Sequence, residues 1–494
     1  MSTTANLSVK VPSTIFQTYE KKDSKTITFT INPTDVAYAN TLRRMILSGV
    51  QTVAFRSDMD DKGRTTSVKI ISNSTPMTNE MLADRIGMLP ITIRNPHRWN
   101  SDRFHFKLAV SNPNPEPMDV TADMLQVFEV KKDGTEVPIK DGNRNFFHPD
   151  ELTGETALLA ILKGKRAGQQ AEEIILEATA TTGYGREHAR FIPVSQCAYR
   201  YTRDKDEGRR EGMFKNWLAK SKKETRDPEK IEADKLAAFR REYSTMEVDR
   251  CYLQDDNDEP YSFDFTVESI GTMDPELIVQ RALQSAITMC AKYTSIHEAL
   301  PQDMRKAPAD ARMEGFDFTF LGQDHTLGNL LQSYIDLNLL DGTKVTYVGY
   351  KIPHPLRDEM VLRIGIAGGQ EVDARRVVSS AADGCAKMFS FWLKMWESVA
   401  SLPPEQPMTP VVETPQVDDT SSAVNSVSVL NTSSNTNTNT NNNSSNTSSN
   451  TSANTSSNTN STASENTQNK STIERTGEKT VIRKKRTGIS KADG

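Results

Sequence analysis

A short motif occurs twice in this chain and constrains its fold more than any other feature. A Phe-Thr pair, followed at fixed spacing by Asp, Asn and Leu, occupies residues 29–42 and again residues 318–331. In both places a strand-like apolar run precedes a polar helix start and an amphipathic helix. The chain therefore carries two copies of one module, and a module used twice on one chain predicts an internal pseudo-dimer.

Each motif predicts a helix with one buried face. Asp35 and Asp324 stand where a carboxylate caps the first turn and meets the positive end of the helix dipole. The expected buried stripes are Val36, Ala39, Leu42, Met45 and Ile46 in the first copy, and Leu327, Leu330, Leu331, Tyr334 and Ile335 in the second. A capped amphipathic helix is the ordinary meaning of one such pattern. The spacing shared by two copies favours a common module whose helices pack against each other.

Each copy also ends in a strand and a second, longer helix. Residues 261–267 and 361–366 have the pattern of strands, and Asp274-Pro275 opens a helix in the first copy. In the second copy, apolar residues alternate at spacings of three and four: Val378, Ala381, Cys385, Met388, Trp392, Met395 and Val399. Because that spacing is typical of a helix packed along another helix, we expect Met388 and Trp392 to lie between the copies.

The first copy is interrupted, whereas the second is nearly continuous. We expect a discontinuous module at 1–72 and 256–302, an insert domain at 73–255, a second module at 312–402 and a tail at 403–494. Within the insert, residues 203–247 alternate in charge and predict an exposed helical insertion or a helical hairpin, broken near Asp227-Pro228. That hairpin is either a solvated face or a docking surface.

Several ordered stretches resemble one family of proteins. Residues 32–45, 82–91 and 185–194 are similar to the third-largest subunit of eukaryotic RNA polymerase II, the archaeal D subunit and, more distantly, the bacterial alpha subunit. Residues 324–331 and 350–356 are similar to the eleventh subunit and the archaeal L subunit. In that family the two are separate chains that dimerise, whereas here they are fused.

The resemblance implies an α+β fold, in which two alpha-like dimerisation modules, each a small sheet with two helices, pack through their helices beside a mostly β insert. It implies a non-catalytic platform that binds the largest and second-largest RNA polymerase subunits, with small polymerase subunits nearby and DNA reached only through the complex. It further implies that Arg43 and Arg44, whose second-copy counterparts are Gln332 and Ser333, dock the second-largest subunit. The alternative is that both arginines are solvated and cover apolar surface with their stems.

Composition limits the remaining possibilities. The net charge of −5 argues against nonspecific nucleic-acid binding by the whole chain. No apolar run approaches the roughly 18 to 20 residues of a membrane span, and the start lacks a secretory signal, so we expect a soluble, intracellular protein without membrane contact. Cys197, Cys251, Cys290 and Cys385 are widely separated. We therefore expect no metal and no cofactor, although many third-subunit relatives carry a cysteine cluster in the insert.

The tail has a composition of its own. Residues 431–460 are Asn, Ser or Thr except for Ala453, which predicts disorder because nothing there can be buried. The basic run at 483–486 is a nuclear-import signal, a phosphate-seeking arm or, more simply, solvated charge. The tail and the fusion suggest a large DNA virus that encodes its own polymerase, with the virion, a cytoplasmic viral factory or the nucleus as the site of work.

Enzyme hypotheses find no support in the motifs. The seven histidines are dispersed, and the chain has neither His-Glu-x2-His nor a Gly-x-Ser-x-Gly turn. Two hypotheses remain, a polymerase assembly subunit and a stand-alone pseudo-dimeric binding protein that works outside a polymerase.

Overall fold

The first copy of the repeat builds a four-stranded antiparallel sheet with two helices. The computed structural model describes residues 14–58, 67–310 and 313–402. The sheet order is β1 (Phe16–Lys21), β2 (Thr26–Ile31), β13 (Phe263–Ser269) and β12 (Val194–Tyr201). The helices are α1 (Val36–Ser48) and α6 (Pro275–Ala291). We call these six elements the first module.

The second copy builds the same parts from a shorter stretch of chain. Its sheet order is β14 (Met304–Pro308), β15 (Gly315–Leu321), β17 (Glu359–Ile366) and β16 (Val345–Lys351), again antiparallel throughout. Its helices are α7 (His325–Asn338) and α8 (Glu371–Val399). In both modules the motif helix directly follows a sheet strand, β2 or β15, as the repeat predicts. We call these elements the second module.

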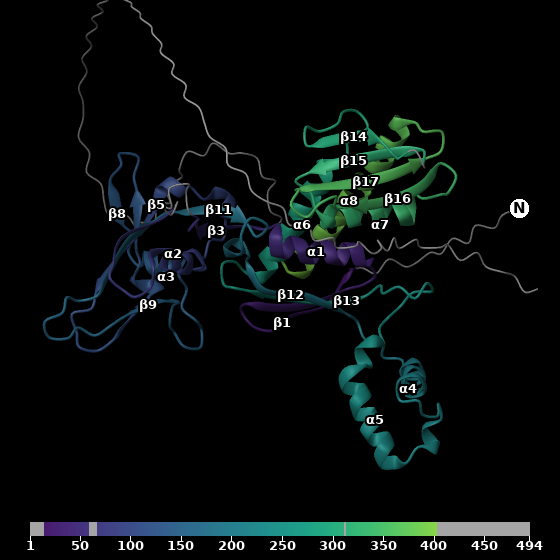
Figure 1. The fold of residues 1–494 in the computed structure, drawn as a ribbon, viewed down its shortest axis with the longest axis horizontal. Helices are drawn as coiled ribbons and strands as arrows, with labels where there is room; N and C mark the ends of the chain where they lie inside the picture. The colour runs from purple at the N-terminus through teal and green to yellow at the C-terminus, as the bar shows by residue number, and fades with distance from the viewer. Residues whose placement is uncertain (1–13, 59–66, 311–312, 403–494) are drawn as a thin grey trace, which may run out of the picture. The chain divides into compact units, whose positions relative to one another are not determined.

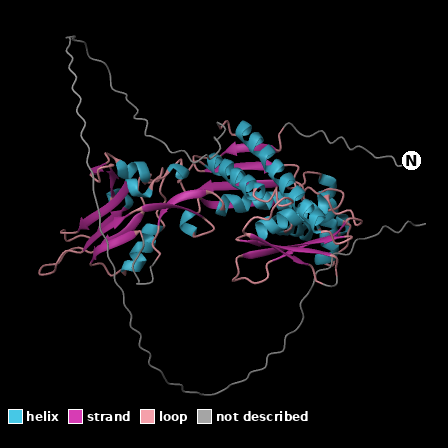
Figure 2. Ribbon diagram, turned by 90° about the horizontal axis from the view of Figure 1, so that it is seen from above, coloured by secondary structure: helices cyan, strands magenta, loops and turns pink. Residues whose placement is uncertain are grey.

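The four helices lie as a layer between the two sheets. Figure 1 shows α7 and α8 against the sheet of the second module, with α1 and α6 between them and the strands β1, β12 and β13. Figure 2 shows the helices and strands of this region as separate layers. Because helices from both modules share this layer, their apolar faces are buried against each other as well as against their own sheets.

A third group of elements has its own core. A five-stranded sheet runs in the order β4 (Val68–Asn73), β10 (Glu173–Ala178), β5 (Phe104–Ser111), β7 (Gln126–Val130) and β8 (Glu136–Pro138). Two strand pairs accompany it, β3 (Gln51–Phe55) with β11 (Ala180–Tyr184) and β6 (Met118–Thr121) with β9 (Leu158–Leu162). The helices are α2 (Asn79–Gly87) and α3 (Gly142–Phe146), and one apolar cluster unites the group.

The insert differs from its predicted bounds of 73–255 at both ends. Val53 and Phe55 of β3 already belong to its core, and β12 at Val194–Tyr201 has returned to the sheet of the first module, where it pairs with β13. Burial alternates along β13, which was predicted as a strand, but not along β3, where four successive residues are buried. Such a pattern records which face of a strand is buried and not which sheet the strand joins.

The charged insertion forms two helices between β12 and β13. These are α4 (Glu207–Ser221) and α5 (Ala233–Met246), and a short 3-10 turn at Pro228–Lys230 separates them near the predicted break. We call them the α4–α5 hairpin. The mix of helices with antiparallel sheets confirms the α+β class. The predictions for the tail at 403–494 lie outside the described residues, and within those residues no helix has the length and apolar character needed to cross a bilayer.

Candidate interface between the two modules

The two motif helices begin at equivalent aspartates. The Asp35 carboxylate accepts a hydrogen bond from the Ala37 backbone N–H at 2.6 Å, and the Asp324 carboxylate accepts one from the Thr326 N–H at 2.7 Å. Each aspartate has extended backbone and satisfies a donor that the helix leaves free in its first turn. The caps therefore set the start, and hence the rotational phase, of α1 and α7.

The end of α8 is buried in the core of the first module. The Trp396 side chain is fully buried, and its indole N–H donates to the Glu276 carbonyl at 2.9 Å. Its ring packs at 5.1 Å from Phe16 and 4.9 Å from Phe29, measured between ring centroids. One turn earlier, Trp392 packs at 6.0 Å from Phe16. A helix of the second module thus completes the aromatic core of the first.

The end of α6 makes the reciprocal contact. Tyr293 and Ile296, just beyond α6, are fully buried in the core of the second module. The Tyr293 ring lies 4.9 Å from that of Phe320, and its hydroxyl donates to Asp303 at 2.9 Å. Each core therefore contains side chains from the other copy, Trp396 of α8 in the first and the two residues that follow α6 in the second.

An ion pair joins the modules in one direction. The Arg44 Nη2 lies 2.9 Å from Asp324 Oδ2, and its Nε donates to the Thr326 hydroxyl at 2.5 Å. Arg186 adds a second contact, because its guanidinium donates to the Gly322 carbonyl at 2.7 Å and to Asp358 at 2.6 Å. The reverse pair cannot form, since the second-copy counterpart of Arg44 is Ser333.

This asymmetry gives the two capping carboxylates opposite pKa shifts. Burial raises the pKa of Asp35, and the single hydrogen bond from Ala37 offsets only part of that effect. Burial alone would also raise the pKa of Asp324, but the hydrogen bonds from Thr326 and the charges of Arg44 and Arg186 lower it below its usual value. The pKa of the second cap is therefore lowered first by Thr326 of its own helix and then by Arg44 of the first copy and Arg186 of the loop after β11.

The structure divides the predicted stripes between two faces. Leu327, Leu331 and Ile335 are fully buried in the core of the second module, whereas Leu330 joins the core of the first module. Tyr334 is partly buried and packs against both cores. The predicted residues that meet in the first-module core are Val36, Ala39, Leu42, Met45, Ile46, Leu330, Tyr334, Cys385, Trp392, Met395 and Val399, of which Val36, Met45, Tyr334, Met395 and Val399 are partly buried.

Met388 differs from its predicted place. It is 39% exposed, and the adjacent Phe389 is the fully buried residue. A strict alternation of three and four averages 3.5 residues per turn, whereas a straight helix has 3.6, so the buried stripe of a 29-residue helix drifts by about one residue. The observed stripe runs through Val378, Ala382, Cys385, Phe389, Trp392 and Trp396.

Sequence reasoning missed three contributors to this interface. Phe389 and Trp396 were absent from the predicted set, although a 3.6-residue period from Val378 would have found both. Gly384 is the third: a Cβ at this position would lie 2.2 Å from the ring of Tyr334, so glycine permits α7 to approach α8 closely. No sequence signal marks that glycine, because its requirement comes from a side chain of another helix.

The predicted docking arginines have different surroundings. Arg44 is engaged with the second module, whereas the Arg43 Nε donates to Asn40 of its own helix at 3.0 Å. Across the described ranges Arg43 has no ion-pair partner. The four cysteines are buried free thiols, and the described part of the chain brings no three His, Cys, Asp or Glu side chains together as metal ligands.

Protein-family models match most of the residues of both modules. Two family models, each described as the RNA polymerase Rpb3/Rpb11 dimerisation domain, match residues 28–290 and 316–393. The first match covers more than half of the chain.

Individual relatives carry related descriptions. The DNA-directed RNA polymerase subunit Rpo3 of Methanopyrus kandleri is 30% identical over 185 residues, which are 37% of this chain and 57% of that protein. The DNA-directed RNA polymerases I and III subunit RPAC1 of Bos taurus is 24% identical over 312 residues, 57% of this chain and 84% of the relative. The DNA-directed RNA polymerase II subunit rpb3 of Dictyostelium discoideum is 24% identical over 295 residues, 53% and 88% of the two chains. The chain spans little more than half the length of the archaeal relatives it matches.

Proposed function

The chain belongs to the RNA polymerase Rpb3/Rpb11 dimerisation domain family, and on that premise we propose that it is a non-catalytic assembly subunit of a DNA-directed RNA polymerase. In this proposal one chain supplies both halves of the platform as a covalent pseudo-dimer, which binds the largest and second-largest subunits. The observation that carries the proposal is the burial of Trp396 of α8 in the core of the first module, together with that of Tyr293 and Ile296, which follow α6, in the core of the second.

The size of that contact supports a permanent pair. Leu330, Phe389, Trp392 and Trp396 of the second module are all essentially unexposed inside the core of the first. Burying one such side chain is worth about 1.5 to 3 kcal/mol. An interface that resembles a domain core cut in half is typical of obligate partners, so the modules are expected to stay together throughout assembly.

The two neighbouring arginines have different contacts, and we propose a different role for each. Arg44 meets Asp324 and Thr326, so we propose that it fixes the register of the two modules. Arg43 is half-buried and bonds only a neutral amide through its guanidinium, which leaves donors available. We propose that Arg43 docks the second-largest subunit, because a planar guanidinium forks onto carboxylates and carbonyls.

Purification of the tagged chain from its native source tests the proposal. We expect two large subunits to co-elute with it in equal amounts, together with small polymerase subunits. A chain that elutes alone at every stage would favour the alternative of a stand-alone binding protein. A viral source, and a location in the virion, the viral factory or the nucleus, remain predictions. The organism and the compartment from which the complex is purified would test them.

Single arginine variants then separate docking from folding. Arg43→Ala should weaken capture of the second-largest subunit while the melting temperature stays unchanged, since losing a buried charged partner at an interface costs roughly 2 to 5 kcal/mol. Arg44→Ala is the matched control, and it should lower the melting temperature slightly with less effect on capture. Equal capture by both variants would remove Arg43 from the docking surface.

A further inference from the structure

A run of lysines lies along α4 and the turn that follows it. Residues 212–223 include four lysines and no aspartate or glutamate. Lys222 is engaged within the hairpin, since its ammonium pairs with Glu242 at 2.6 Å and lies over the ring of Trp217. The other three lysines are exposed and have no ion-pair partner within the described ranges: Lys215, Lys220 and Lys223. We call these three residues the lysine cluster.

Lys215 and Lys220 flank the solvent-facing side of α4. Phe214 is buried in a small core that the hairpin forms by itself. Because an α-helix turns by about 100° per residue, Gly212 and Asn216 lie nearly opposite Phe214. By the same reckoning, Lys215 lies to one side of these two residues and Lys220 to the other. The large apolar residues that the described chain exposes include none from α4. This side of the helix therefore offers positive charge and no apolar anchor.

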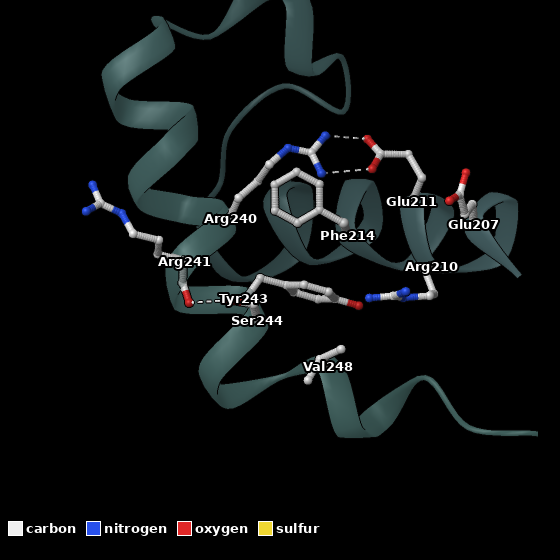
Figure 3. Close-up of a pocket in the computed structure, with 9 residues that line it drawn as sticks. All are labelled: Glu207, Arg210, Glu211, Phe214, Arg240, Arg241, Tyr243, Ser244 and Val248. Carbon is white, nitrogen blue, oxygen red and sulfur yellow. Dashed lines mark hydrogen bonds and ion pairs between the residues drawn. The ribbon is translucent and has the colours of Figure 1, made fainter. Parts of the chain in front are cut away.

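Acidic side chains of the hairpin are engaged with other cations or belong to α5. Glu211 of α4 accepts hydrogen bonds from both terminal nitrogens of Arg240 at 3.0 Å, across the gap between the two helices (Figure 3). Glu224 pairs with Lys235 of α5 at 2.5 Å. Three more exposed acids lie in the turn before α5 and in its first residues: Glu229, Glu232 and Asp234. Along α4 itself no acidic residue follows Glu211, so its second half keeps a positive surface.

The phosphate backbone of a duplex fits this surface better than the alternatives. Lysine is depleted at protein interfaces, whose centres are apolar, and a helix lying on a membrane buries apolar side chains that α4 does not expose. Single strands bind by stacking their bases on aromatic rings. The aromatic rings of α4 are Phe214, which is buried, and Trp217, which is partly buried in the hairpin core. A duplex needs only cations beside its phosphates.

We propose that the lysine cluster binds the phosphate backbone of double-stranded nucleic acid without reading its sequence. A lysine ammonium is a compact charge on a flexible stem, and phosphate contacts carry no sequence information. Because the whole chain has a net charge of −5, the contact is local to the hairpin and weak. It adds a direct contact with nucleic acid to an assembly role that has none. The hairpin core shares no residue with the core of either module, so neither proposal depends on the other.

The salt dependence of duplex binding by the full chain tests the proposal. The probe is a fluorescein-labelled DNA duplex, and its binding is followed by fluorescence polarisation between about 50 and 200 mM salt. The logarithm of the association constant should fall linearly with the logarithm of the salt concentration, with a slope of about −0.9 for each phosphate neutralised. Three lysines should thus contribute about −2.7 to the slope, which is a loss of about fortyfold in affinity over that range.

Two triple variants with the same change in net charge locate the contact. The cluster variant should bring the slope about 2.7 closer to zero, and it combines Lys215→Gln, Lys220→Gln and Lys223→Gln. The matched control should leave the slope unchanged, and it removes three exposed lysines around β7 and β8 through Lys131→Gln, Lys132→Gln and Lys140→Gln. A further variant replaces the basic run at 483–486 with glutamine, because that run is another source of positive charge. Circular dichroism of each variant checks that the chain stays folded.

Three outcomes would overturn the proposal. The first is an equal slope for the cluster variant and the parent chain. The second is loss of binding only in the variant of the 483–486 run, which would assign the contact to the tail. The third is cluster-dependent binding that is stronger to a labelled polyglutamate peptide than to the duplex, which would make this surface a protein contact. Co-purification with the large subunits tests the assembly role separately, so failure of either proposal can be told from failure of the other.

Discussion

Trp396→Ala should destabilise both modules at once. Its side chain is fully buried against Phe16 and Phe29, and its indole N–H satisfies the Glu276 carbonyl. Removing a buried tryptophan side chain costs about 3 to 5 kcal/mol, and an orphaned carbonyl costs about 1 to 3 kcal/mol more unless water enters the cavity. We expect a net loss of about 4 kcal/mol, a large share of the roughly 5 to 15 kcal/mol of a typical domain.

Guanidinium unfolding followed by far-UV circular dichroism would measure that loss. Trp396→Phe, which keeps most of the ring and removes the donor, should cost about 1 to 2 kcal/mol. Trp217→Ala is the matched control, because Trp217 is partly buried in the separate cluster of the α4–α5 hairpin. Hydrogen exchange should show β2 and β15 losing protection together in Trp396→Ala. A loss below about 1 kcal/mol, or no greater than that of the control, would refute the shared core.

Three further predictions concern the motif helices. Leu331→Asp should prevent a soluble fold, because it places an unpaired charge in the core of the second module, and normal expression with an unchanged melting temperature would contradict this. A double-mutant cycle of Arg44→Ala and Asp324→Ala should give a coupling energy of about 0.5 to 1 kcal/mol. We expect a small value because both side chains are 34% exposed and water screens the ion pair. A coupling energy of zero would show that Arg44 does not hold the modules together and would leave it available to bind another subunit. Because the pKa of Asp324 is lower in the folded protein than in the unfolded chain, its carboxylate stabilises the fold at pH values above the unfolded-state pKa. This stability is lost as the pH falls through the folded-state pKa, so Asp324→Asn should make stability depend less on pH below about pH 4. The pKa of Asp35 is raised, which means that the folded state favours its protonated carboxyl and gains stability from this group as the pH falls. Asp35→Asn should therefore not flatten acid unfolding, and equal pH profiles for the two variants would be evidence against the asymmetry.

The sequence by itself determined the local elements of this protein. The repeated motif located both module helices, their capping aspartates and the strands before them, because caps and a 3.6-residue apolar period depend only on neighbours along the chain. The charged stretch between β12 and β13 was predicted, for the same reason, to be helical with a break near Asp227-Pro228. The likeness of the two motifs also showed that the chain holds one module twice.

Only the tertiary structure decided which partner each element meets. Leu330 and Leu331 are adjacent in one apolar stripe, yet they enter different cores, since α7 has a sheet on one side and helices of the first module on the other. The pairing of Arg44 with Asp324 and the packing of Trp396 against Phe16 join residues hundreds of positions apart. Periodicity specifies that a face is buried, whereas the crossing of helices and the joining of sheets specify what buries it, and those depend on contacts that no local pattern encodes.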